Sequence, residues 1–119
     1  MANLVHSALA DDGTVIVTVL GEIDFANSDH VSQGIQDAVT RWAPSTVCVD
    51  LKDATFIDST GLGALIEGYR TTAEIECRFV VINPTAGFRR VLTVTGLDEL
   101  FGLGDSTGAS IIASSATGA

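Results

Sequence analysis

The sequence predicts a single α/β domain with a mixed, mostly parallel β-sheet, one antiparallel strand and crossover helices packed on the sheet. Short runs rich in β-branched residues alternate with segments of helical periodicity. Only the first strand has a hairpin-length connection, so it is expected to be the antiparallel one. The chain has 119 residues, of which 46% are hydrophobic, which suits one domain with its own core.

Residues 4–9 and 14–23 are expected to form a hairpin, because the turn between them contains the pair Asp12-Gly13. The second strand is predicted to be long. Its apolar run is typical of a strand covered on both faces.

Residues 24–41 are expected to form a helix capped by Asn27 or Ser28. Gly34 lies inside this helix, where glycine costs about 1 kcal/mol relative to alanine. Apolar residues recur every three or four positions, as one buried helical stripe requires. They are Val31, Ile35, Ala38 and Val39.

The middle of the chain continues the alternation. Residues 46–51 are expected to form a strand, and residues 52–58 a loop whose Phe56 and Ile57 pack inward. Ser59 is expected to open the next helix. The apolar face of that helix consists of Leu62, Leu65, Ile66 and Tyr69.

The last elements are a buried strand at residues 78–82, a helix at 85–95 that ends at Gly96, and a final short strand at 100–103. The inward residues of the helix are expected to be Phe88, Val91 and Leu92. Residues 1–104 thus form the domain. Residues 105–119 are a Gly/Ser/Ala-rich C-terminal tail, expected to be a short helix or disordered.

Charge and composition exclude several classes of function. The net charge is −9, so neither nucleic acid nor an anionic membrane surface is an expected partner. No apolar run approaches the roughly 20 residues of a membrane span, and the N-terminus lacks an export signal. Cys48 and Cys77 have no metal or redox spacing and are expected to be reduced, packed thiols. These features predict a cytoplasmic protein.

Enzymatic motifs are incomplete. Gly61-Leu62-Gly63 lacks the third glycine of a dinucleotide fingerprint, because Ile66 stands at the matching position. His6 and His30 have no metal-ligand partner at a recognisable spacing and are expected to be surface residues. Neither a phosphate-binding loop nor a GxSxG nucleophile elbow occurs. We therefore expect no catalytic residue, cofactor, metal or small-molecule substrate.

The most informative stretch leads from a strand through a loop into the helix at Ser59. Asp58, Ser59 and Thr60 are all good helix caps, and capping is the simplest interpretation. The alternative is a phosphorylation switch. A phosphoserine carries about −1.5 to −2 charges, which the N–H groups at a helix N-terminus stabilise. Asp24 is expected to lie close to this charge, in the loop after the second strand.

In this stretch the sequence resembles the STAS domains of bacterial anti-sigma factor antagonists. The resemblance covers about residues 15–101 and is most specific between Phe56 and Gly63. The other matching segments are Gly21-Glu22-Ile23-Asp24, Val49-Asp50-Leu51, Asn83-Pro84 and Val94-Thr95-Gly96-Leu97.

The resemblance implies a function. The unphosphorylated protein would bind an anti-sigma factor that is also a serine kinase, and so release a sigma factor. The kinase would phosphorylate Ser59, with Thr60 as a weaker candidate, and a phosphatase would reset the protein. The implied partner-binding residues are Asp24, Asp58, Ser59, Thr60, Gly61, Leu62 and Gly63.

A second function stays open. The chain would then be a STAS-like accessory or scaffold subunit of a transporter or sensory complex, in which Ser59 need not be phosphorylated. The sequence departs from the family after Leu103, where little of an amphipathic C-terminal helix is present.

Overall fold

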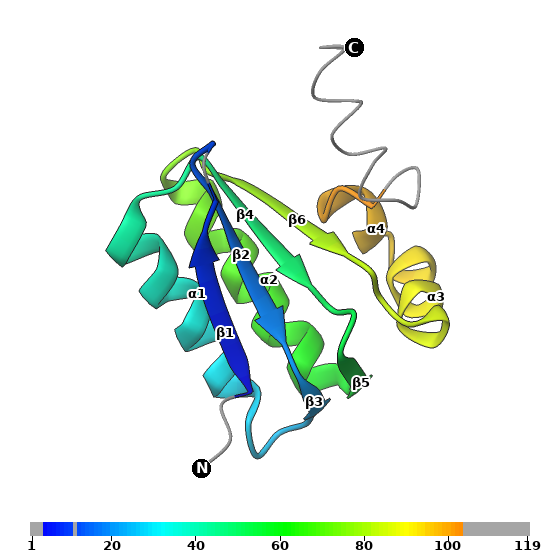
Figure 1. Cartoon of the computed structure of the whole chain (residues 1–119). Coiled ribbons are helices and arrows are strands. Elements are labelled where there is room, and N and C mark those ends of the chain that lie inside the picture. The colour runs from blue at the N-terminus through cyan, green and yellow to red at the C-terminus, as the bar shows by residue number, and fades with distance from the viewer. Residues whose placement is uncertain (1–3, 11, 104–119) are drawn as a thin grey trace.

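The computed structural model describes residues 4–10 and 12–103, so the predicted tail at 105–119 lies outside the described residues. A four-stranded sheet has the strand order β1-β2-β4-β6, and β3 and β5 form a two-stranded sheet (Figure 1). The elements in chain order are β1 (Val5–Leu9), β2 (Thr14–Val19), β3 (Gly21–Ile23), α1 (Ser28–Trp42), β4 (Thr46–Asp50), β5 (Ala54–Ile57), α2 (Ser59–Glu74), β6 (Arg78–Ile82), α3 (Ala86–Thr95) and α4 (Leu97–Leu100).

The predicted sheet is confirmed. β1 pairs with β2 antiparallel, whereas β2, β4 and β6 run parallel to one another. Helices α1 and α2 lie behind the sheet as Figure 1 is drawn, and both serve as crossover connections between parallel strands. Within the described residues, no helix is both long enough and apolar enough to cross a bilayer.

The prediction of one long strand over residues 14–23 is wrong. Gly21 has φ +77°, a left-handed conformation that glycine adopts at little cost, and the strand breaks there. The part after the break, β3, pairs in parallel with β5. Residues 52–58 were expected to be a loop, yet β5 occupies Ala54–Ile57 because this pairing satisfies its backbone.

The prediction that this strand is covered on both faces is also wrong. Val15, Val17 and Val19 of β2 are buried against the helices, while Ile16 between them is 37% exposed. Helices α1 and α2 cover one face only, so side chains of β2 alternate between core and solvent. A run of β-branched residues thus reflects strand propensity here and not two-sided burial.

The predicted helix is present as α1, and Val31, Ile35 and Ala38 are buried as expected. It begins at Ser28 and not at residue 24, and Asn27 at the N-cap position makes no side-chain capping hydrogen bond. A Cβ atom on Gly34 would lie 2.7 Å from Cγ1 of Val5 in β1. Glycine in mid-helix therefore lets α1 approach the edge strand, which offsets its low helix propensity.

The C-terminal part of the described chain differs from the prediction. Residues 100–103 were expected to be a strand, but Leu100 is the last residue of α4 and the chain then turns, burying Phe101 completely. The N–H of Val81 in β6 donates to the carbonyl of Phe101, a single bond that does not form a ladder. In α3, Phe88 and Leu92 are buried as predicted, whereas Val91 is 43% exposed.

Candidate functional site

The candidate site lies where β3 and β5 end. The two strands are parallel and Ile23 pairs with Ile57, so Asp24 and Asp58 leave the sheet from equivalent positions. The N–H of Asp58 donates to the carbonyl of Ile23 at 3.1 Å. Two residues 34 positions apart in the sequence are thereby placed at one edge, as the sequence analysis expected of Asp24.

Asp58 is the N-cap of α2. Its carboxylate accepts from the N–H of Thr60 at 2.9 Å, from the N–H of Gly61 at 3.0 Å, and from the hydroxyl of Thr60. The hydrogen bond from the Thr60 hydroxyl, followed by that from Gly61, holds the pKa of the Asp58 carboxyl below its ordinary value. Of the three candidate caps in the sequence, Asp58 is the one that caps.

Ser59 is the first residue of α2, and its side chain is exposed. Within the described residues its hydroxyl has no hydrogen-bond partner, whereas the hydroxyl of Thr60 is held by Asp58. The two hydroxyl groups therefore differ: both are in solvent, but only that of Ser59 is free to turn.

The N-terminus of α2 has fewer free N–H donors for a phosphate than was expected from the sequence. The N–H groups of Thr60 and Gly61 already bind the Asp58 carboxylate, and that of Leu62 donates to the Asp58 carbonyl. A phosphate on Ser59 would find these three donors occupied and an ionised carboxylate beside it. It would add negative charge to the surface without receiving hydrogen bonds from these three N–H groups.

The two glycines of the first turns have different roles. A Cβ atom on Gly61 would lie 2.6 Å from Cγ2 of Ile57 and 2.9 Å from Cγ2 of Ile23, so glycine allows the helix to pack on both strands. A Cβ atom on Gly63 would meet nothing within 4 Å. Leu62 between them is half-buried and packs against the core.

The loop after β3 is fixed by Asn27, a residue that the sequence analysis considered only as a helix cap. Its side-chain oxygen accepts from the N–H of Asp24 at 2.9 Å, and its amide donates to the carbonyl of Glu22 at 2.9 Å. The Asp24 side chain in turn accepts from the N–H of Ala26 at 3.0 Å. The Asp-x-x-Asn spacing was the available signal, because both residue types form such local side-chain bonds.

Sequence analysis also placed Phe56 inside the protein, and this is wrong: the side chain is 55% exposed. Gly21 pairs with Ala54 and Glu22 with Phe56, so Thr55 is an extra residue in β5. Such a bulge changes the direction of the next side chain. Phe25, in the loop between β3 and α1, is 70% exposed.

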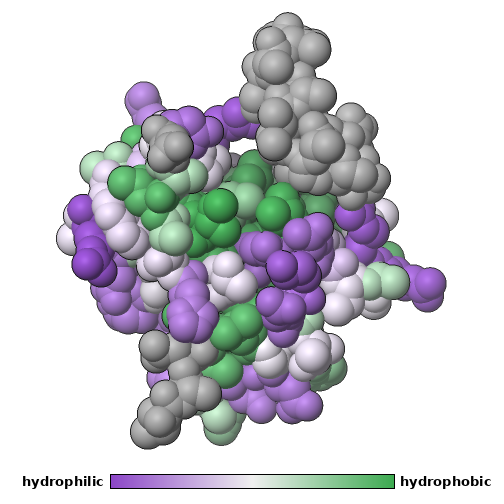
Figure 2. Space-filling view, in the orientation of Figure 1, coloured by the Kyte–Doolittle hydropathy of each residue, from purple (hydrophilic) through white to green (hydrophobic). Residues whose placement is uncertain are grey.

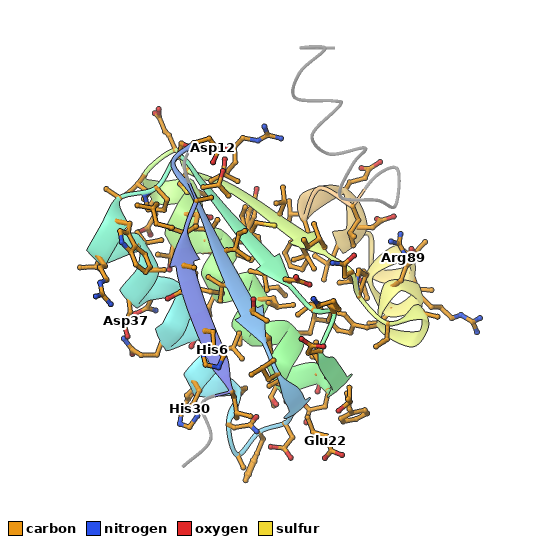
Figure 3. All side chains as sticks on the ribbon, viewed as in Figure 1. His6, Asp12, Glu22, His30, Asp37 and Arg89 are labelled. Atoms are coloured by element: carbon orange, nitrogen blue, oxygen red, sulfur yellow. The ribbon has the colours of Figure 1, made fainter. Side chains whose placement is uncertain are left out.

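His6 on β1 and His30 on α1 are exposed, and Figure 3 shows both with the edge strand and the start of α1. In the described part of the chain, no three His, Cys, Asp or Glu side chains are grouped as a metal site would require. Cys77 is buried, and burial together with the charge of Asp50 raises the pKa of Cys48 to about 11.

Comparison with known proteins agrees with this geometry. The model of the STAS domain family matches residues 7–113. The chain belongs to the STAS domain family. This STAS domain is 28% identical over 94 residues to the anti-sigma F factor antagonist of Paenibacillus polymyxa, covering 79% of this chain and 80% of that protein.

Solved structures extend the comparison. An anti-sigma factor antagonist from Mycobacterium paratuberculosis is 29% identical to this STAS domain, with a TM-score of 0.65 and coverage of 85% and 86% of the two chains. The phosphorylated form of the Bacillus cell fate determinant SpoIIAA shares the fold at 23% identity, with a TM-score of 0.65 over 80% of this chain and 86% of that one.

Proposed function

We propose that this protein is an anti-sigma factor antagonist whose activity is controlled by phosphorylation of Ser59. In the unphosphorylated form it binds an anti-sigma factor that is also a serine kinase, which then releases its sigma factor. Phosphorylation of Ser59 by that kinase ends the interaction, and a phosphatase restores it. The protein acts in the cytoplasm by binding and catalyses no reaction itself.

One observation carries this proposal: the free, exposed hydroxyl of Ser59 directly follows the capping Asp58 at the end of β5. A kinase needs an accessible hydroxyl, and this one is not committed to a hydrogen bond within the described residues. The names of the relatives from Paenibacillus polymyxa and Mycobacterium paratuberculosis support the same role.

Thr60 is the weaker acceptor. Its hydroxyl donates to Asp58, and transfer of a phosphoryl group to it would remove that donor from the cap. Phosphorylation of Ser59 leaves all the bonds of the cap in place. The fold can therefore carry the modification on Ser59 without losing the start of α2.

The partner surface consists of the ends of β3 and β5 and the first two turns of α2. Asp24 and Asp58 contribute charge, and Ser59 and Thr60 contribute hydroxyl groups. Gly63 leaves a bare stretch of helix that a partner backbone can approach, because space is open around its Cα. Gly61 and Leu62 act indirectly, by holding the helix on the strands.

Phosphorylation would weaken binding for a physical reason. A partner that covers Ser59 removes water from it, and a desolvated phosphate beside the ionised Asp58 is costly unless the partner supplies a cation. A loss of about 2.7 kcal/mol already weakens binding about a hundredfold.

The test uses the purified anti-sigma factor with serine kinase activity from the same genome. Phosphate transferred from Mg-ATP is located by mass spectrometry, and affinity is measured by calorimetry. We expect phosphate on Ser59, none in Ser59→Ala, and binding about a hundredfold weaker for Ser59→Asp. Ser7→Asp adds the same charge at an exposed position of β1 and is expected to bind like the unmodified protein.

Equal affinity of Ser59→Ala and Ser59→Asp would overturn the switch. Stable binding without any phosphate on Ser59 would instead favour the accessory or scaffold subunit, in which Ser59 serves only as the first residue of α2.

A further inference from the structure

Two phenylalanine side chains are exposed in the segments that form the candidate site. Phe25 is 70% exposed and Phe56 is 55% exposed. Every other aromatic side chain in the described part of the chain is buried or half-buried: Trp42, Tyr69, Phe79, Phe88 and Phe101. The exposed aromatic groups are therefore confined to the two segments that build the candidate site. A large apolar group in water at such a place indicates a surface that another molecule covers.

The backbone holds Phe56 outward. The bulge at Thr55 pairs Phe56 with Glu22, whose side chain is also exposed. Figure 3 shows Glu22 pointing away from the strands into solvent. After the bulge, Ile57 returns to the core, where it packs against the buried cluster. The outward position of Phe56 is thus built into the register of β3 and β5.

The loop that carries Phe25 is also fixed. The N–H groups of Asn27 and Ser28 donate to the carbonyl of Asp24, at 3.1 and 2.8 Å. The Asn27 side chain closes the same turn through the N–H of Asp24. Phe25 is therefore presented on an ordered turn, which lowers the entropy lost when a partner covers it.

The two segments that carry the rings are acidic. Glu22, Asp24 and Asp58 lie in the two segments, residues 21–28 and 54–63, and neither segment contains a lysine or arginine. Figure 2 shows hydrophobic and hydrophilic residues side by side at the end of the molecule where β3 and β5 lie. The complementary surface is apolar at its centre and basic at its rim.

We propose that Phe25 and Phe56 are the anchors by which this protein docks its protein partner, and that the partner receives them in an apolar cleft edged by lysine or arginine. The inference rests on the proposed function and names the chemistry of that partner.

The test measures the affinity of the same purified anti-sigma factor kinase for Phe25→Ala and Phe56→Ala. Burial of one phenylalanine side chain predicts a loss of about 10- to 100-fold for each variant. Phe56→Tyr keeps the ring and is expected to retain most of the affinity. Val94→Ala is the matched control, because Val94 is 80% exposed on α3, and its affinity should be unchanged.

Two further measurements show whether the variants still fold and whether charge contributes to binding. The thermal midpoints of the phenylalanine variants should stay close to that of the unmodified protein, because more than half of each side chain is exposed. Binding of the unmodified protein should weaken when salt is raised from about 0.05 to about 0.5 M.

The outcomes distinguish the two proposals. If Ser59→Asp loses affinity while Phe25→Ala and Phe56→Ala bind normally, the anchors are wrong and the antagonist role stands. If the unmodified protein does not bind the kinase, the proposed function fails and the anchors fail with it.

Discussion

At the scale of single residues, the site depends on one carboxylate with several partners. Asp58 accepts two backbone N–H groups and the Thr60 hydroxyl, and so fixes the start of α2 next to the free hydroxyl of Ser59. Had Ser59 itself been the cap, its hydroxyl would be engaged and unavailable. Because Asp58 is the cap, the hydroxyl of Ser59 stays free, as the proposed phosphorylation requires.

The hydrogen bond from Thr60 can be tested by titration. In Thr60→Val, the pKa of Asp58 is expected to rise toward its ordinary value of 3.8, because the largest stabilising contact of the ionised form is removed. NMR chemical shifts of the carboxyl carbon measure this. Asp12, whose pKa is lowered by hydrogen bonds from Thr14, is the internal control and should not move.

The sign of the stability effect follows from this shift. Because the pKa of Asp58 is lower in the folded protein, its ionised form stabilises the fold above about pH 3.8, and this contribution is lost as pH falls through the folded-state pKa. When pH is lowered from neutral to below about 3.8, the free energy of unfolding should therefore fall less in Thr60→Val than in the unmodified protein. An identical acid dependence would contradict the assignment.

At the scale of elements, α2 rests on β3 and β5 through its first turn. Gly61 is required there because both Ile57 and Ile23 lie within 3 Å of where its Cβ would be. Their branched side chains start close to the backbone and cannot swing away, so the helix itself would have to move.

Gly61→Ala and Gly63→Ala form a matched pair for this contact. Gly61→Ala is expected to lower the free energy of unfolding by about 1–2 kcal/mol, because overpacking outweighs the gain in helix propensity. Gly63→Ala is expected to raise it by about 0.5–1 kcal/mol, since space around it is open. Urea denaturation measures both. A stabilised Gly61→Ala would show that the helix start is free to shift.

Some of these elements could be predicted from the sequence, and others could not. Local periodicity located α1, α2 and α3, because an apolar stripe and a cap are both encoded nearby. The break at Gly21 and the pairing of β3 with β5 were missed, because they depend on contacts between distant segments. The start of α2 at Ser59 was predicted from its motif, whereas the exposure of Phe56 depends on a bulge that no local pattern encodes.

At the scale of the whole molecule, Phe101 joins the C-terminal helices to the sheet. It is completely buried, with ring centroids 5.5 Å from Phe79 and 6.4 Å from Tyr69, and its carbonyl accepts from Val81. It therefore fastens the chain after α4 to β6 and to α2 at once.

Phe101→Ala is expected to lower the free energy of unfolding by about 3–5 kcal/mol, a large part of the roughly 5–15 kcal/mol that stabilises a domain. Leu100→Ala is the control, since Leu100 is 40% exposed and its removal should cost under about 1 kcal/mol. Chemical denaturation measures both. Equal effects would mean that α3 and α4 do not depend on this contact.

The small sheet of β3 and β5 has a consequence for signalling. It is not hydrogen-bonded into the four-stranded sheet, and the chain turns at Gly21 before entering it. If Ser59 is phosphorylated as proposed, we expect the phosphate to act on a partner that contacts the ends of β3 and β5, and not through the four-stranded sheet.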